Sequence, residues 1–599
     1  MASPVTFTHL PVTPSARKNG FNQAPYGEVV IPMTVEQLQK APFYLDYQDI
    51  TWVRRTLDAM TTDEKIGQLF FPIAYSPRPE DLDRLLEAHV GGILFRAGPA
   101  KEIHEAHTYL QEHTRVPLLL AANLECGGNG LVLEGTPYGC NMQVAATDDP
   151  IRNAEHLGEI ACKEAAAVGC NFSFAPDVDI DMNAHNPITN VRTFGSDPQR
   201  VEACGRAYIR GAQSAGCATA AKHFPGDGVD ERDQHLLTSI NTLSVQDWDA
   251  TFGKVYAGMI EEGTLSIMAG HIALPAYARA LGATAQEAAL PATLSPVLIS
   301  RLLREKLGFQ GLVISDATPM VGFCSAMKRE DAVPSCIMAG CDMFLFNKDL
   351  QEDIVYMKRG LERGVLTEAR LEEAVIRILG LKAALGLHEK QERHALIPSG
   401  EAQRVIGCPV HMRLARDCAD ASVTLVKDTD SLLPLHPQRY KRLLLEVLGD
   451  FPSNARVEKT VTQLLSEQGF HVIPYVREGM AQDGSLMVDT VEQFKAKYDA
   501  VLYVGNIENV SNRTTNRINW YTFFGLGNNI PWFVHEVPTV FLSLGNPYHL
   551  LDVPMIGTYI NAYSNSDIVI EAAVKKLLGQ APFRGRSPSD PEGFFHTMH

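Results

Sequence analysis

The stretch GLVISDA, residues 311–317, shows the element from which most of this chain is built. A glycine is followed by three branched apolar residues with no polar residue between them, and then by a serine and an aspartate. Such an unbroken run is typical of a strand that is buried on both faces, as in a parallel sheet covered by helices. Seven further runs are of this kind: QLFFPIAY (68–75), GGILF (91–95), PLLLAANLE (117–125), FSFAPDVDI (172–180), TAAKHFPG (219–226), LSIMAGHIAL (265–274) and DMFLF (342–346).

Helix-like segments separate these eight runs. Examples are PEDLDRLLEAH (79–89) and NAEHLGEIACKEAAAVG (153–169), in which apolar residues recur at helical spacing. Apolar strands that alternate with helices indicate an α/β fold with a parallel sheet. Eight such units within about 300 residues predict a (β/α)8 TIM-type barrel.

The chain is too long for one ordinary domain, and its composition changes along its length. We expect a Pro-rich extension on the surface (1–45), the barrel (46–388), a polar linker (389–405) and a C-terminal αβα sandwich (406–599). The last region has no G-x-G-x-x-G motif, and we interpret FFGLGNN (523–529) as a turn. Five apolar runs predict its sheet: KRLLLEVLG (441–449), HVIPYV (471–476), AVLYVGN (500–506), TVFLSLGN (539–546) and TYINAYS (558–564).

Composition narrows the choice of partners. The 599 residues carry a formal net charge of -17, and this acidic excess argues against nucleic acid or an anionic membrane as the main partner. Because no run approaches about 20 apolar residues and the N-terminus has no apolar leader, we expect no membrane partner and a cytoplasmic location. The eleven cysteines show no C-x-x-C pair, which predicts free thiols in a reducing compartment. No metal-ligand spacing is present, so we expect neither a metal nor another cofactor. The oligomeric state is left open.

Polar residues gather where the predicted barrel strands end. In a parallel barrel these ends share one face, where active sites lie. A single residue of this kind is more often a cap or turn residue, but five runs with the same ending favour a site. The residues are Asn123, Glu125, Asp177, Asp179, Lys222, His223, His271 and Asp316.

The segment KHFPGDGVDERDQH, residues 222–235, carries the second chemical signal. Lys222 and His223 end a strand, and two glycines then allow the chain to leave it and move. Asp233 and His235 are two residues apart, so in extended backbone their side chains face the same way. A carboxylate bonded to one ring nitrogen of a histidine fixes the tautomer and leaves the other nitrogen to give or take a proton.

These residues resemble glycoside hydrolase family 3, in its β-N-acetylglucosaminidase branch. The motif K-H-F-P-G-x-G-x(4)-D-x-H, followed later by G-L-V-I-S-D-A, carries the resemblance. Residues 60–70, 174–198 and 339–346 are similar to further family segments, and parts of 419–550 look like the family's second domain. The resemblance extends from about residue 50 over nearly the whole chain, and it implies a two-domain enzyme.

The resemblance also implies roles for individual residues. Asp316 is expected to be the nucleophile, His235 the acid/base group, and Asp233 the residue that orients His235. Arg192, Lys222 and His223 resemble the family's ligands for sugar hydroxyls, and we add Asn123 and His271 as substrate-binding candidates. His271 is equally compatible with a buried supporting role.

This sequence departs from the family pattern at three positions. Asn123 stands where a sugar-binding aspartate is expected, and Leu131 where an arginine is expected. Asp227 replaces a common histidine of the P-G-H-G segment. These changes concern recognition of the sugar. The three residues expected to carry the chemistry, Asp316, His235 and Asp233, are all present.

Three functions are compatible with the sequence. The leading one is a retaining exo-β-N-acetylglucosaminidase that acts on wall or chitin fragments by double displacement. The second is a β-glycoside phosphorylase, or a β-glycosidase for another sugar, on the same scaffold, because a histidine acid/base does not repel an incoming phosphate. The third is a non-catalytic sugar-binding protein.

Overall fold

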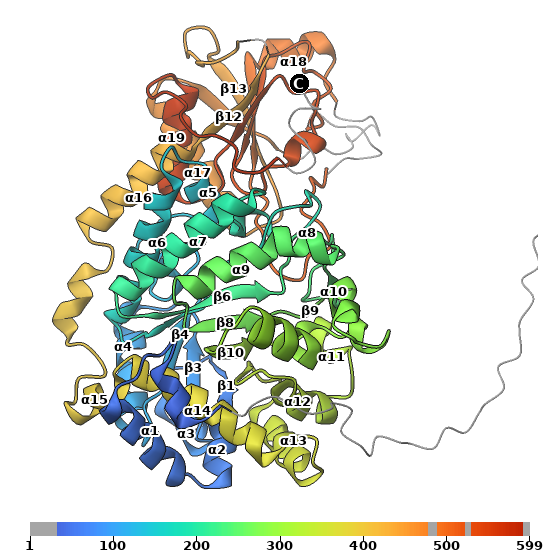
Figure 1. Ribbon diagram of the computed structural model, residues 1–599. Coiled ribbons are helices and arrows are strands. Elements are labelled where there is room, and N and C mark those ends of the chain that lie inside the picture. The colour runs from blue at the N-terminus through green and yellow to red at the C-terminus, as the bar shows by residue number, and fades with distance from the viewer. Residues whose placement is uncertain (1–32, 430, 477–487, 521–528, 591–599) are drawn as a thin grey trace, which may run out of the picture.

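The structure is a computed structural model that describes residues 33–429, 431–476, 488–520 and 529–590. Figure 1 shows a large α/β unit that carries strands β1 to β11 and a smaller one above it that carries the later strands. Most of the predicted turn at 523–529 lies outside the described residues.

The larger sheet closes into a barrel of eight strand positions in the described part of the chain. Seven strands pair in parallel in the order β10-β8-β6-β5-β4-β3-β2, and β11 pairs with β1. β1 and β2 are two halves of one strand around Pro72, and a bridge from Ile314 to Met343 joins β10 to the start of β11. This confirms the predicted barrel. The strands are β1 (Phe70–Phe71), β2 (Ile73–Ala74), β3 (Gly92–Phe95), β4 (Leu119–Ala122), β5 (Phe172–Ser173), β6 (Ala218–Phe224), β8 (Ser266–Ala269), β10 (Leu312–Ser315) and β11 (Phe344–Leu345).

Helices cover the outside of the barrel (Figure 1). Two of the longest, α6 and α7, begin with Asp-Pro pairs: Asp149 and Asp197 accept hydrogen bonds from the first helical turn, and the proline supplies the first helical residue. The main barrel helices are α1 (Tyr47–Asp58), α2 (Thr62–Gln68), α3 (Pro79–Glu87), α4 (Ala100–Glu112), α6 (Pro150–Ala166), α7 (Pro198–Ser214), α9 (Phe252–Glu261), η6 (Val297–Lys306), α12 (Arg329–Met338), α13 (Leu350–Glu362) and α14 (Glu368–Ala384).

The second sheet has the strand order β12-β17-β16-β15-β13-β14. All its pairs are parallel except β12 with β17, and β12 was not among the five predicted runs. Most residues of this edge strand are only half-buried, so its sequence lacks the continuous apolar signal. The strands are β12 (Thr424–Asp428), β13 (Arg442–Leu448), β14 (His471–Pro474), β15 (Ala500–Gly505), β16 (Thr539–Ser543) and β17 (Thr558–Asn561).

Both faces of this sheet are buried. Along β13, Leu443 and Leu445 pack into the core shared with the barrel side, whereas Leu444 packs into an aromatic core on the opposite face. This alternation is the two-residue period of a strand between two covered faces. The covering helices are α16 (Pro409–Ser422), α17 (Asn454–Glu467), α18 (Val491–Lys497) and α19 (Asp567–Leu577).

Two segments differ from their expected surface or linker character. Residues 33–45 form the short helix η1 (Val35–Gln39) and pack inward, with Leu38 fully buried against Gly380. The polar linker contains part of α15 (Leu387–Glu392) and the helix η7 (Gly400–Val405), because its few apolar residues pack against the core. The proposed domain boundaries stay predictions.

The two units are joined by buried polar contacts. Glu164 of α6 is fully buried and accepts hydrogen bonds from the Gly407 N–H (3.1 Å) and from His411 Nδ1 (2.7 Å). Asp181, beyond β5, accepts from the hydroxyls of Tyr548 and Ser589, the latter at 2.7 Å. Loops at the strand ends of the barrel are therefore held against the second unit.

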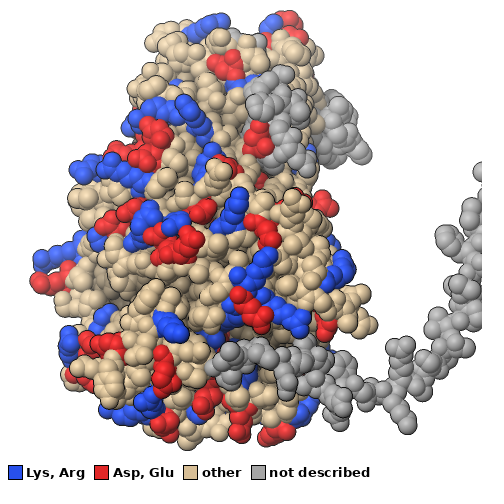
Figure 2. Space-filling model, in the orientation of Figure 1, with Lys and Arg blue, Asp and Glu red and all other residues tan. Residues whose placement is uncertain are grey.

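The described surface shows no strong separation of charge on the face drawn in Figure 2, where basic and acidic side chains are interspersed. None of the helices in the described ranges is both long and apolar enough to cross a membrane.

Candidate active site

The site lies at the ends of the barrel strands. Lys222 and His223 belong to β6, and Asp316 directly follows β10. The Asp316 N–H donates to the carbonyl of Ala269, the last residue of β8, at 2.8 Å. These pairings place Lys222, His223 and Asp316 at one mouth of the barrel, as expected for parallel strands.

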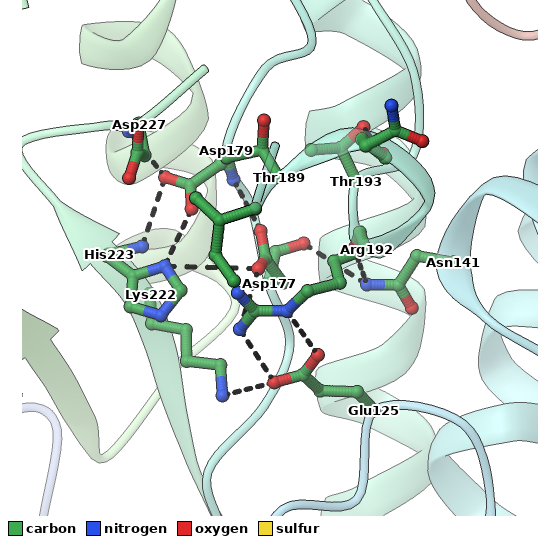
Figure 3. Close-up of polar contacts among 12 residues, drawn as sticks. Glu125, Asn141, Asp177, Asp179, Thr189, Arg192, Thr193, Lys222, His223 and Asp227 are labelled. Atoms are coloured by element: carbon green, nitrogen blue, oxygen red, sulfur yellow. Dashed lines mark hydrogen bonds and ion pairs between the residues drawn. The ribbon is translucent and has the colours of Figure 1, made fainter. Parts of the chain in front are cut away.

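A bidentate ion pair forms one side of this mouth (Figure 3). Glu125 accepts from Arg192 Nε (2.9 Å) and Nη2 (3.0 Å), and Lys222 Nζ lies 2.5 Å from the same carboxylate. Burial alone raises the pKa of Glu125, but the two cations outweigh it and hold the pKa well below its ordinary value. Arg192 and Lys222 are thus fixed in place as charged donors.

Figure 3 also shows a second polar group around His223. His223 Nδ1 lies 2.7 Å from Asp179 Oδ2, and Nε2 lies 3.9 Å from Asp316 Oδ2. Burial raises the pKa of Asp316, but its electrostatic interactions with His223, His271 and His235 and the hydrogen bond from the Ala317 N–H lower the pKa overall. Asp316 is therefore an ionised carboxylate at the end of a rigid strand.

Asp233 and His235 form a hydrogen-bonded dyad. Asp233 Oδ1 accepts from His235 Nδ1 at 2.7 Å and from the His235 N–H at 2.8 Å. The carboxylate is fully buried, whereas 26% of the imidazole is exposed. Burial raises the pKa of Asp233, but its bonds to His235 and to the Asn512 N–H lower it overall. In the described part of the chain, His235 Nε2 is left without a partner and is open to a ligand.

The loop that carries the dyad is docked on the barrel mouth. The Val321 N–H donates to the His235 carbonyl (3.1 Å), and the Gly322 N–H donates to the Gln234 carbonyl (3.2 Å). The His271 N–H donates to Gln234 Oε1 at 2.7 Å. Because Val321 lies five residues after Asp316, these bonds bring the dyad and Asp316 to the same mouth.

The two glycines of this loop are packed closely against neighbouring residues and do not form an open hinge. Gly226 and Gly228 have φ of +117° and +100°. A Cβ on Gly228 would lie 2.0 Å from the Ile180 carbonyl oxygen, and one on Gly226 would lie 2.2 Å from the Phe252 ring. The glycines therefore allow both the left-handed backbone and close packing.

The remaining predicted ligands lie in different surroundings. Asn123 directly follows β4 and is exposed at the mouth. His271 is fully buried, and its ring nitrogens contact Thr293 Oγ1 and the Ala317 carbonyl, each at 2.9 Å. It supports the turn after Asp316 and has no ring nitrogen left for a sugar. Leu131 is fully buried in the apolar core, so it does not reach the mouth.

Asp227 is also buried, at the start of the loop. Its Oδ1 accepts from the Gly228 N–H at 2.7 Å, and its own N–H donates to Asp179 Oδ1 at 2.7 Å. Burial and the nearby Asp179 charge raise its pKa well above the ordinary value. It holds the loop and does not face the mouth as a charged ligand.

Sequence reasoning places three carboxylates at the mouth without giving them a role, and it misses one backbone amide. Glu125, Asp177 and Asp179 stand out as residues at strand ends, but nothing local shows which cations they bind. Ligand atoms of Asp177, Asp179 and His223 lie within 4.8 Å of one another, as in a metal site. Arg192 lies 3.4 Å from Asp177 and His223 bonds Asp179, so ion pairs within the chain account for this group. The amide, Asn512, has no sequence signal.

A cavity of about 350 Å³ opens beside the dyad, between the barrel loop and the second domain. Arg513 stacks on Phe451, with its guanidinium 5.0 Å from the ring centroid. The lining residues are His185, Glu231, Arg232, Asp233, Leu236, Leu237, Arg513, Thr514, Thr515 and Arg517.

Comparisons with known proteins agree with this architecture. The Glycosyl hydrolase family 3 N terminal domain matches residues 61–381. A β-N-acetylglucosaminidase/β-glucosidase of Cellulomonas fimi is 46% identical over 564 residues, which cover 92% of this chain and 98% of that protein. A solved structure of the β-glucoside phosphorylase BglX is 41% identical, with a TM-score of 0.86, and the match covers 94% of this chain and 99% of the other. A family 3 β-N-acetylglucosaminidase from Paenibacillus sp. str. FPU-7 shares the fold at 22% identity, with a TM-score of 0.73 and coverage of 89% and 99%.

Proposed function

Because this chain belongs to glycosyl hydrolase family 3 and is a glycosidase for β-linked sugars, we propose that it releases a terminal N-acetylglucosamine-type sugar with retention of configuration. One observation carries the proposal: the Asp233–His235 dyad is docked on the segment that follows Asp316. This docking supports His235 as an acid/base group and Asp316 as a nucleophile at the same mouth of the barrel.

In the proposed reaction, Asp316 attacks the anomeric carbon and forms a covalent glycosyl-enzyme. His235 gives its Nε2 proton to the leaving oxygen as that bond breaks. The same nitrogen then takes a proton from water, whose oxygen attacks the anomeric carbon and frees Asp316. The buried Asp233 stabilises the imidazolium form, and the restrained Arg192 and Lys222 donate hydrogen bonds to sugar hydroxyls.

Aryl glycosides test this proposal. Asp316→Asn should lower turnover of p-nitrophenyl N-acetyl-β-glucosaminide or p-nitrophenyl β-glucoside by about 10³-fold or more, because it removes the attacking group. Asp331→Asn is a matched control, since Asp331 pairs with Arg363 on the outer helices. A 2-fluoro glycoside should leave a covalent label on Asp316 in a peptide digest. Full activity of Asp316→Asn, or a label elsewhere, would contradict the assignment. Comparing the two sugars decides between a glucosaminide and a glucoside.

Phosphorolysis is a second candidate for the acceptor step. It is favoured by the 41% identical phosphorylase, by the carboxylate–histidine dyad in place of an anionic acid, and by the guanidinium of Arg513 in the adjacent cavity. Turnover with and without phosphate tests it: a phosphorylase yields a sugar 1-phosphate, and Arg513→Gln should raise the KM for phosphate. Phosphate-independent turnover without sugar phosphate would leave hydrolysis. The non-catalytic alternative is set aside, because the closely matching relatives are named as enzymes.

We also infer a reducing, cytoplasmic compartment. All eleven cysteines are free in the structure, and most are buried in the core. Cell fractionation of the native host tests this inference, and recovery outside the cytoplasm would contradict it.

A further inference from the structure

The dyad has a third member, and the second domain provides it. The Asn512 N–H donates to Asp233 Oδ2 at 2.8 Å. The other oxygen, Oδ1, already accepts from the backbone and ring of His235. Both oxygens of this buried carboxylate are therefore satisfied, and one of the donors comes from 279 residues further along the chain.

The backbone around Asn512 is built to present this N–H. Asn512 has φ of +67°, a left-handed conformation that asparagine adopts more readily than other non-glycine residues. Its side chain contacts Ser511 Oγ, at 3.3 Å, and is exposed. The contribution of this residue to the site is thus its N–H and its conformation.

The segment is anchored at both domains. Asn516 Nδ2 donates to the Pro187 carbonyl of the barrel at 2.7 Å, and Asn546 Nδ2 donates to the Asn516 carbonyl at 3.1 Å. The Ile518 N–H donates to Asp552 Oδ2 at 3.2 Å. These bonds hold the segment after β15 between the barrel loop and the second sheet.

We propose that Asn512 is a positioning residue of the acid/base dyad, through which the second domain fixes the orientation of Asp233. The inference rests on the proposed roles of Asp233 and His235. With Oδ2 held by Asn512, the carboxylate cannot rotate about Cβ–Cγ, and Oδ1 stays directed at His235 Nδ1. His235 Nε2 then stays directed at the leaving oxygen. Asp316 does not depend on this contact, so its attack is independent of the second domain.

A matched pair of variants tests the N–H together with the backbone conformation that presents it. Asn512→Gly keeps the N–H and accepts the left-handed backbone, and should remain within about twofold of the native enzyme. Asn512→Pro removes the donor and cannot adopt positive φ. Because general acid catalysis supplies about 10²–10⁴-fold, we expect Asn512→Pro to lower kcat/KM by about 10–100-fold for a chito-disaccharide, whose leaving group needs protonation. The 2,4-dinitrophenyl glycoside needs no protonation and should change by less than about fivefold.

Three further measurements complete the test. His235→Ala should show the same dependence on leaving group, and adding Asn512→Pro to it should cause no further loss. Retained activity on the dinitrophenyl glycoside shows that the protein is folded. If Asn512→Pro fails to fold, Asn516→Ala displaces the same segment and should show the same preference, at about 3–10-fold.

The inference is overturned if these variants slow both substrates equally, or neither. If His235→Ala itself shows no dependence on leaving group, the proposed acid role fails first and the inference falls with it. If His235→Ala shows the expected dependence on the leaving group but the variants at 512 and 516 do not, only the positioning role is refuted.

Discussion

Asp179→Asn tests the electrostatic account of the nucleophile. Asp179 holds His223 through Nδ1, and His223 Nε2 lies 3.9 Å from Asp316 Oδ2. An amide at position 179 removes the carboxylate partner of His223, so the electrostatic interaction with His223 that lowers the pKa of Asp316 is weakened. We expect the pKa of Asp316 to rise.

The magnitude follows from the distance. Two unit charges about 4 Å apart interact by about 4 kcal/mol at an effective dielectric constant near 20. The substitution also removes the negative charge of Asp179 on the far side of the imidazole, which offsets about half of that loss. A net change of about 2 kcal/mol corresponds to about 1.5 pH units.

The assay is the pH dependence of kcat/KM for an aryl glycoside between pH 4 and 8. The native pKa of Asp316 is lowered, so activity is retained until the pH falls through that low value. In Asp179→Asn the acid limb should move up by about 1.5 pH units, so activity should fall at the acid end of this range and change little at pH 7.

Asp177→Asn is the matched control for this experiment. Asp177 Oδ2 lies 3.9 Å from His223 Nδ1, against 2.7 Å for Asp179 Oδ2, so an amide at position 177 leaves the hydrogen bond that holds His223 intact. Its acid limb should not move to higher pH. The reasoning is refuted if Asp179→Asn leaves the acid limb unmoved or moves it to lower pH.

Three other predictions each concern a single residue. Glu125→Gln leaves Arg192 and Lys222 without their shared carboxylate, and we expect KM to rise about 10–100-fold in steady-state assays. An unchanged KM would contradict the sugar-binding arrangement. Gly228→Ala places a Cβ against the Ile180 carbonyl at positive φ and should distort the loop that carries His235. For substrates whose leaving group needs protonation, kcat/KM should fall at least tenfold. Unchanged kinetics would show that the loop tolerates the strain. Burial lowers the pKa of Lys382 to about 7, so native stability should rise between pH 7 and about pH 10. Lys382→Met should therefore be more stable at pH 7 by a few kcal/mol in urea unfolding, because each pH unit by which burial lowers the lysine pKa costs about 1.4 kcal/mol. This advantage should shrink at pH 9.5, and a constant difference would refute the explanation.

Local sequence determined most of the architecture. The eight apolar runs lie at the barrel strands, because burial on both faces of a parallel sheet requires continuous apolar residues. The half-buried edge strand β12 has no such requirement and was missed. The bond between Asp233 and His235 also depends on local spacing, but the expected extended backbone was wrong: residues 234–236 form a turn, and the Asp233 carboxylate accepts from both the N–H and the ring of His235 at its start.

Tertiary structure alone decided how the site is assembled. Glu125 meets Arg192 and Lys222 through strands and loops that are far apart in the chain, and the Asn512 N–H reaches Asp233 from another domain. The burial of His271, with both ring nitrogens occupied, likewise depends on Thr293 and Ala317. Hydrogen bonds and charge pairs act over a few ångströms in space, so a pattern along the chain can name these residues but cannot pair them.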